Sequence, residues 1–208
     1  MNIKVCGITS FKQLQQLDGL NIAYAGLVFD SSSPRYAGNS EEKRIISEAD
    51  FDLRKVGVFV NPSLGDAIDA IDDFKLDVVQ LHGDESPELC DDLSSQAEVI
   101  KVFSIDDTID DVDALIAPYD NVCDYYLFDT KADGKAGGTG KKFNWSKIAK
   151  AKIEKPFFIS GGIGPDDAAA IKAFKHPDFF GIDINSRFEK EPGVKDMGLI
   201  LQFLQNFK

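Results

Sequence analysis

Several short apolar runs in this sequence end on a residue that can transfer a proton or bind an anion. The residues at these positions are Cys6, His82, Asp129 and Asp183. A thiolate can act as a base or a nucleophile, and a carboxyl group that is partly shielded from water suits a general acid. These residue types indicate proton-transfer chemistry, provided that the fold brings the ends of the runs together.

Cys6 lies two residues after Lys4, so the two side chains share one face of an extended strand. A nearby ammonium group favours the thiolate, and we expect Cys6 to serve as a base or nucleophile. Asp183 should lie near Lys4 if the last strand pairs with the first. The alternative is that Cys6 is a small buried core residue, which is the commoner role of cysteine and the one we assign to Cys90 and Cys123.

Asp129 ends a bulky apolar run and opens residues 130–143, which are rich in Gly and Lys. This position at the mouth of an active site suits a general acid, although the carboxylate could instead cap N–H groups of its own loop. His82 shares a strand face with Gln80, and it could either hydrogen-bond a substrate or orient a loop. Lys101 is expected in a buried ion pair rather than in a catalytic role.

Two short segments in the last third of the chain favour the binding of a phosphate group. Gly161-Gly162 and Asn185-Ser186 follow the last two apolar runs. Barrel enzymes commonly bind phosphate there, through backbone N–H groups and a short helix N-terminus. Earlier in the chain, the guanidinium of Arg35 could bind a carboxylate through two hydrogen bonds, or Arg35 could be an ordinary surface residue.

Eight apolar runs alternate with stretches of helical periodicity along the chain. Alternating strands and helices fit either a closed barrel or an open doubly wound sheet, and eight units favour the barrel. An open dinucleotide-binding sheet should also carry G-x-G-x-x-G after its first strand, whereas this chain has Cys6-Gly7-Ile8-Thr9. We therefore expect an α/β protein with a single domain, residues 1–208, folded as a (β/α)8 TIM barrel. Its active site should lie at the C-terminal ends of the strands.

Composition excludes several classes of partner. The net charge of −12 and the lack of any basic run longer than Lys141-Lys142 argue against nucleic acid. No apolar run approaches the roughly 18 to 20 residues that span a bilayer, and the first residues do not resemble a secretion signal. Three cysteines without metal-type spacing disfavour disulfides and structural zinc. We expect a cytoplasmic protein that binds a small phosphorylated molecule; a monomer and a homodimer both remain open.

With these residues in place, the sequence resembles the phosphoribosylanthranilate isomerase family of tryptophan biosynthesis. The resemblance extends from the first strand to the last helix, through segments that occur in the same order. These segments are Lys4-Val5-Cys6-Gly7-Ile8-Thr9, Gly26-Leu27-Val28-Phe29 with Ser33-Pro34-Arg35, Val56-Gly57-Val58-Phe59, Gln80-Leu81-His82-Gly83, Asp129-Thr130 with Gly137-Gly138-Thr139-Gly140, Ser160-Gly161-Gly162-Ile163, and Gly181-Ile182-Asp183 with Glu189, Pro192-Gly193 and Lys195-Asp196.

The resemblance implies a β/α barrel that carries out an Amadori rearrangement without cofactor or metal. The substrate would be N-(5-phosphoribosyl)anthranilate and the product 1-(2-carboxyphenylamino)-1-deoxyribulose 5-phosphate. Asp129 would be the general acid that opens the sugar ring, and Cys6 the general base that removes the C2′ proton. Arg35 would hold the anthranilate carboxylate. The phosphate would bind at Gly161-Gly162 and at residues 183–186, and Gln80 and His82 would contact the substrate.

One position departs from the family pattern. After Asn185-Ser186 the family commonly has Gly, a small aliphatic residue and Glu, whereas this chain has Arg187-Phe188-Glu189. Arg restricts backbone conformations that are open to Gly. Arg187 either supplies positive charge to the phosphate or points to solvent.

Two other functions compete with the isomerase. Another phosphate-binding barrel isomerase, such as that of histidine biosynthesis, has similar chemistry but uses two aspartates, and Cys6 disfavours it. A non-catalytic sugar-phosphate sensor on the same scaffold is the second alternative. The presence of both Cys6 and Asp129, with no added DNA-binding segment, weighs against a sensor.

Overall fold

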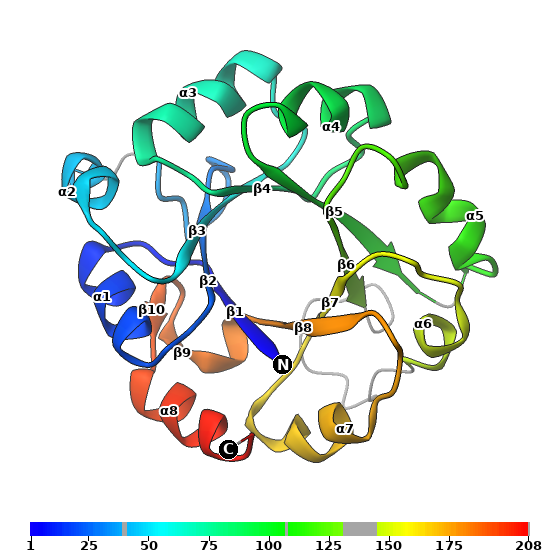
Figure 1. Ribbon diagram of the computed structural model, residues 1–208. Helices are drawn as coiled ribbons and strands as arrows, with labels where there is room; N and C mark the ends of the chain where they lie inside the picture. The colour runs from blue at the N-terminus through cyan, green and yellow to red at the C-terminus, as the bar shows by residue number, and fades with distance from the viewer. Residues whose placement is uncertain (39–40, 107, 131–144, 208) are drawn as a thin grey trace.

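The eight parallel strands form a closed barrel in which each strand pairs with the next and β8 returns to β1 (Figure 1). The computed structural model describes residues 1–38, 41–106, 108–130 and 145–207. Closure places Lys4 of β1 opposite Asp183 of β8, as expected from the sequence. The strands are β1 Asn2–Cys6, β2 Tyr24–Val28, β3 Arg54–Phe59, β4 Val78–Leu81, β5 Glu98–Ile105, β6 Tyr125–Thr130, β7 Phe157–Ser160 and β8 Phe179–Ile184.

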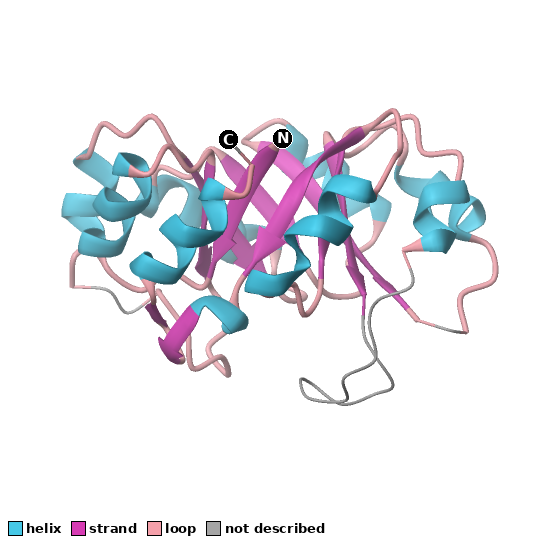
Figure 2. Cartoon of the chain, turned by 90° about the horizontal axis from the view of Figure 1, so that it is seen from below, coloured by secondary structure: helices cyan, strands magenta, loops and turns pink. Residues whose placement is uncertain are grey.

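Helices surround the barrel in chain order and cover its outer face (Figures 1 and 2). Several begin at residues whose side chains accept a hydrogen bond from the first turn, for example Ser63 from the N–H of Asp66 and Ser86 from the N–H of Leu89. The helices are α1 Phe11–Gly19, α2 Lys43–Glu48, α3 Leu64–Phe74, α4 Pro87–Ser94, α5 Val112–Ile116, α6 Ser146–Lys150, α7 Ala168–Ala173 and α8 Met197–Gln205, with single 3-10 turns η1 Ala117–Tyr119, η2 Pro165–Asp167 and η3 Ser186–Phe188. The (β/α)8 barrel predicted from the sequence is thus confirmed.

Strand alternation divides the buried side chains into two clusters. The larger cluster lies between the strands and the helices, and the smaller one fills the barrel interior. At the amino-terminal end of the interior, the rings of Tyr24, Tyr125, Phe158 and Phe180 pack with centroids 5.2 to 6.1 Å apart. This aromatic packing fills one end of the barrel, so a substrate must enter from the carboxyl ends of the strands.

The connection from β8 to α8 carries a short hairpin, β9 Glu189–Glu191 with β10 Val194–Lys195. The hairpin lies beyond the carboxyl ends of the strands, at the lower left in Figure 2. Its base is fixed because the buried ring of Phe188 packs on Phe203 of α8, with centroids 4.9 Å apart. The hairpin therefore brings charged residues from late in the chain to the end of the barrel where β1 and β2 finish.

Among the described residues, no helix combines the length and the apolar character that crossing a bilayer requires.

Candidate active site

A cavity of about 320 Å³ opens at the carboxyl ends of the strands. Its lining comes from strand ends and loops distributed around the barrel. All ten residues predicted to be catalytic or to bind substrate lie on its wall, namely Cys6, Arg35, Gln80, His82, Asp129, Gly161, Gly162, Asp183, Asn185 and Ser186. The barrel thus brings the candidate acid, the candidate base and the candidate phosphate turn to one space.

Cys6 ends β1 as a nearly buried thiol, 6% exposed. Lys4 lies on the same face and donates a hydrogen bond of 2.9 Å to Asp183, so the ammonium group is shared between a carboxylate and the neighbouring sulfur. Burial raises the pKa of the Cys6 thiol, and the lowering by Lys4 does not offset it. Lys4 thus favours the thiolate, as expected from the sequence, but its effect on the pKa of Cys6 is smaller than that of burial.

Gly26 of β2 makes the space that Cys6 occupies. A Cβ atom at this position would lie 2.9 Å from the Sγ atom of Cys6 and 3.2 Å from the Nζ atom of Lys4. Both distances are shorter than ordinary van der Waals contact, so a larger side chain would displace the thiol or the ammonium group. The close packing of β1 and β2 thus holds Cys6 in one place.

Asp129 is the last but one residue of β6, across the cavity from β1. Its Oδ2 atom lies 3.3 Å from the Nε2 atom of His82, and its side chain is 17% exposed. Asp129 is more exposed to solvent than Cys6, so its carboxyl group can exchange a proton with water. The alternative that Asp129 caps its own loop concerns residues 131–144, which lie outside the described part of the chain.

The loop after β4 is held by a different carboxylate, Glu85. Glu85 accepts hydrogen bonds from the N–H groups of Asn61 and Gly83 and pairs with Lys101 at 2.9 Å, with both charged side chains buried. The prediction that Lys101 belongs to a buried ion pair is confirmed. Because Glu85 fixes the loop, the ring of His82 is available to face Asp129 and the cavity.

The turn after β7 provides the candidate phosphate site. Gly161 and Gly162 have φ angles of 96° and 65°, a left-handed conformation that glycine adopts without strain. Arg187 also lines the cavity, and its Nε atom lies 2.8 Å from the point where a Cβ would stand on Gly164. The long side chain of Arg187 therefore lies over the glycine turn at the cavity rim, although it is exposed.

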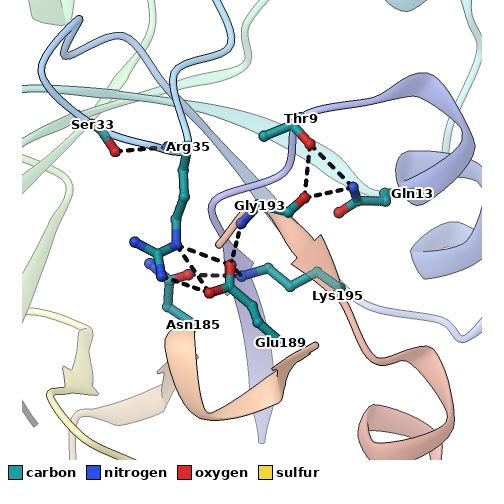
Figure 3. Close-up of polar contacts among 8 residues, drawn as sticks. All are labelled: Thr9, Gln13, Ser33, Arg35, Asn185, Glu189, Gly193 and Lys195. Carbon is teal, nitrogen blue, oxygen red and sulfur yellow. Dashed lines mark hydrogen bonds and ion pairs between the residues drawn. The ribbon is translucent and has the colours of Figure 1, made fainter. Parts of the chain in front are cut away.

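Arg35 is engaged with a residue whose role the sequence did not reveal. Its guanidinium donates three hydrogen bonds of 2.6 to 3.1 Å to the carboxylate of Glu189 (Figure 3). Glu189 also accepts from Lys195 at 2.6 Å, and Lys195 donates to the Oδ1 atom of Asn185 at 2.7 Å. Glu189 and Lys195 were visible only as parts of a matching segment, because the contact that ties them to the cavity comes from Arg35, 154 residues away from Glu189.

Gln80 brings an unpaired acceptor to the cavity. Its side chain is 1% exposed, and its Oε1 atom has no hydrogen-bond partner among the described residues. A buried carbonyl oxygen without a donor costs free energy on the order of 1–3 kcal/mol. Its place on the wall of the cavity therefore favours a donor supplied by a ligand.

Sequence reasoning missed part of the lining. Val28, Val58, Val60 and Ile163 are apolar residues at strand ends or in loops, and Asp30 opens the loop after β2. In a sequence, an apolar residue at the end of a buried strand cannot be distinguished from a residue of the hydrophobic core, so no local signal identified these four as cavity residues. Asp30 could have been found from its position after β2, at the same end of the barrel as Cys6 and Asp129.

A closed β/α barrel with a thiol and a carboxyl group facing one cavity defines a barrel enzyme equipped for acid–base chemistry. The sequence model of the family described as N-(5′-phosphoribosyl)anthranilate (PRA) isomerase matches residues 3–206. This chain belongs to that family, as the resemblance noted from the sequence implied.

Individual relatives agree with this assignment. An N-(5′-phosphoribosyl)anthranilate isomerase from Parabacteroides distasonis is 41% identical over 207 residues, which cover 99% of this chain and 92% of the relative. The crystal structure of phosphoribosyl anthranilate isomerase from Thermotoga maritima superposes with a TM-score of 0.86 at 31% identity, covering 99% and 98% of the two chains. A further isomerase structure, in complex with reduced 1-(o-carboxyphenylamino)-1-deoxyribulose 5-phosphate, has a TM-score of 0.81 at 28% identity and covers 99% and 97%.

Proposed function

We propose that this protein is a phosphoribosylanthranilate isomerase in which Asp129 is the general acid and Cys6 the general base. The observation that carries the proposal is that these two groups line one cavity in a chain that matches the isomerase family over nearly its whole length. The reaction is the Amadori rearrangement of N-(5-phosphoribosyl)anthranilate, an intermediate in the biosynthesis of tryptophan.

The first step needs an acid at the ring oxygen of the sugar. Asp129 gives its proton to that oxygen, and the C1′–O bond breaks as the anthranilate nitrogen forms a protonated imine. The exposure of Asp129 supports this role, because the carboxyl group can take up a proton from solvent before each turnover. His82, 3.3 Å away, is placed to hold the carboxyl group by a hydrogen bond.

The second step needs a base at C2′. Cys6 removes the C2′ proton as a thiolate, and the electrons of that C–H bond neutralise the iminium to give an enolamine, which tautomerises to the ketone. Because burial raises the pKa of the thiol, the thiolate is a strong base once it forms. The charges of Lys4 and Lys195 both lower the pKa of Cys6 and so stabilise the thiolate during the step.

The remaining cavity residues bind the two ends of the substrate. Arg35 is proposed to hold the anthranilate carboxylate, and Gly161-Gly162 with Asn185 and Ser186 the phosphate. The charge of Asp183 does not oppose phosphate binding, because Lys4 neutralises it at 2.9 Å. The Oε1 atom of Gln80, which has no partner in the described part of the chain, would accept a hydrogen bond from a hydroxyl group of the sugar.

Arg187 is proposed to add a positive charge to the phosphate subsite. Its place over Gly164, on the same cavity wall as Gly161 and Gly162, supports this role better than one in bulk solvent. In this chain a long side chain would thus contribute to phosphate binding beside the glycine backbone.

The proposed partner is a free phosphorylated metabolite rather than a macromolecule, and a cytoplasmic location fits an enzyme of amino-acid biosynthesis. The assembly is proposed to be a monomer or a homodimer. One solved relative, from Thermotoga maritima, is a monomeric form generated from a dimeric isomerase.

A direct assay tests the proposed function. The purified protein should deplete the fluorescence of N-(5-phosphoribosyl)anthranilate without any added cofactor. The dephosphorylated substrate should bind much more weakly; equal affinity would move the phosphate site elsewhere. Binding without turnover would favour the sugar-phosphate sensor. Turnover of a histidine-pathway ribotide alone would favour the other barrel isomerase.

A further inference from the structure

Glu189 is a buried carboxylate at the cavity mouth to which the reaction assigns no step. Its side chain is 3% exposed, and it accepts hydrogen bonds from three segments of the chain. The donors are Arg35 in the loop after β2, Lys195 in β10 at 2.6 Å and the N–H of Gly193 at 3.1 Å. Figure 3 shows these contacts meeting at the one carboxylate.

The geometry of the contact with Arg35 is one-sided. Nε donates to both carboxylate oxygens, at 2.9 and 3.1 Å, and Nη2 donates to Oε2 at 2.6 Å. A guanidinium group carries five N–H donors in one plane, and Nε and Nη2 form only one edge of it. Within the described part of the chain, no other hydrogen bond of Arg35 engages Nη1 or the second proton of Nη2, so this end can receive a further carboxylate.

The position of Arg35 directs this open end of the guanidinium towards the ligand space. The side chain lines the cavity and is 19% exposed, so it reaches both the buried Glu189 and the space for the ligand. An arginine side chain has several rotatable bonds, and holding one edge in a bidentate contact removes most of that freedom before a ligand arrives. Glu189 thus orients a group that would otherwise move at the cavity rim.

Lys195 fixes Glu189 in turn. Its side chain is fully buried, and it joins Glu189 to the Oδ1 atom of Asn185. The hydrogen bonds from Arg35 and Lys195 outweigh burial and lower the pKa of Glu189 to about 2, so Glu189 is ionised at neutral pH. Two cations and one anion leave one positive charge in this group, which favours an incoming carboxylate.

We propose that Glu189 is a positioning residue that presents the open end of Arg35 to the carboxylate on the aromatic ring of the substrate. This proposal rests on the proposed function, because it assumes that Arg35 receives that carboxylate. Through Arg35, Glu189 sets the preference for a ring that bears a carboxylate over one that lacks it. A residue that only anchored the hairpin of β9 and β10 would have no such effect.

Two ligands that differ by one carboxylate test this role. The first is reduced 1-(o-carboxyphenylamino)-1-deoxyribulose 5-phosphate, and the second is its phenylamino counterpart without the carboxylate. Binding of each to the wild type and to Glu189→Gln is measured by calorimetry. The variant should weaken the carboxylated ligand on the order of 10- to 100-fold, the equivalent of a charge-assisted hydrogen bond, and leave the other ligand within about twofold. Equal weakening of both ligands, or of neither, would overturn the proposal.

Glu85→Gln is the matched control. Glu85 is equally buried and also accepts from a lysine and from backbone N–H groups, but its partner is Lys101 on the other side of the cavity. Any weakening by Glu85→Gln should be the same for the two ligands. If that control discriminates between them as strongly as Glu189→Gln does, the effect is general loosening of the mouth and the proposal fails.

A second variant keeps the test decisive if Glu189→Gln does not fold. Arg35→Lys retains the charge but lacks the second edge of the guanidinium, so it cannot contact Glu189 and a ligand carboxylate in the same way. It should lose the preference for the carboxylated ligand while binding the other normally; unchanged preference contradicts the proposal. A wild type that binds neither ligand would instead refute the proposed function.

Discussion

The two sides of the cavity differ in how firmly the chain holds the group that would transfer a proton. The thiol side consists of Cys6 with Lys4, Arg35, Glu189 and Lys195. Its side chains are nearly buried except that of Arg35, which is 19% exposed, and two of its ion pairs, Lys4–Asp183 and Arg35–Glu189, join residues far apart in sequence. The carboxyl side centres on Asp129, which is 17% exposed and contacts His82 at 3.3 Å.

This difference follows what the two proton transfers require. A thiolate that removes a carbon-bound proton benefits from a site with little water and with cations already in place. Such cations interact with the thiolate strongly, and no water has to be displaced first. An acid that protonates a ring oxygen must recover its proton at each turnover, and contact with solvent supplies it. The thiol side is thus arranged for rigidity and the carboxyl side for exchange.

The largest expected effect comes from the thiol itself. Cys6→Ser should lower kcat by roughly 10²- to 10⁴-fold, because a serine hydroxyl is a far weaker base, while the substrate still binds. Single-turnover kinetics measure both quantities. Cys90→Ser, a buried cysteine of α4 outside the cavity, is the control and should leave kcat within a few fold. Near-normal turnover of Cys6→Ser would remove the thiol from the mechanism.

On the carboxyl side, Asp129→Asn should lower kcat by a similar or somewhat smaller factor, again roughly 10²-fold or more. The amide cannot donate a carboxylic proton to the ring oxygen, but it can still hydrogen-bond to His82. Binding of the reduced product analogue should therefore change little. An unchanged rate would assign the acid function to another group on this side, such as His82.

The ion pair below Cys6 should dominate the stability of the thiol side. Lys4→Met leaves Asp183 charged and without its partner in a buried setting, which should cost about 3–5 kcal/mol in the free energy of unfolding. Lys43→Met is the control, since Lys43 pairs with Asp73 where both side chains are over two-fifths exposed, and its cost should stay below about 1 kcal/mol. Urea unfolding at pH 7 measures both, and equal losses would contradict the difference in burial.

The space beside Cys6 offers a finer test of rigidity. Gly26→Ala places a methyl group 2.9 Å from the thiol and should cost about 1–3 kcal/mol of stability, with a fall in kcat as Cys6 shifts. At Gly19, the last residue of α1, a Cβ atom would meet nothing within 4 Å, so Gly19→Ala should leave the rate unchanged and cost no stability. If Gly26→Ala also changes neither stability nor kcat, the residues around Cys6 can move to accommodate a methyl group, and the thiol side is less rigid than its packing implies.

The parts that could be predicted from the sequence depend on local pattern. Strand alternation placed Lys4 and Cys6 on one inward face, and the position of Asp129 at a strand end put it at the cavity. The contact of Arg35 with Glu189 could not be found in this way, because the loop after β2 and the start of β9 are 154 residues apart.

The raised pKa of Cys6 could not be read from the sequence either, because it depends on burial by several strands at once. Lys4 was recognised as a neighbour of Cys6. Whether its charge or the burial of the thiol has the larger effect on the pKa depends on all the residues that surround Cys6. Long-range contacts and burial therefore account for what the sequence left open about Arg35 and Cys6.

The smallest expected effect is on how the free energy of unfolding changes at acidic pH, through Glu189 on the thiol side. The pKa of Glu189 is lowered from its ordinary value of 4.5 to about 2 in the folded protein, so its stabilisation is complete above pH 4.5. That stabilisation is lost as the pH falls from 4.5 towards 2, where the folded carboxylate also takes up a proton. Glu189→Gln lacks this titration. The wild type should therefore have a larger free energy of unfolding than the variant at pH 7. The difference, measured by urea unfolding, should decrease between pH 4.5 and 3. A gap that stays constant over this range would mean that the charge of Glu189 does not hold the thiol side together.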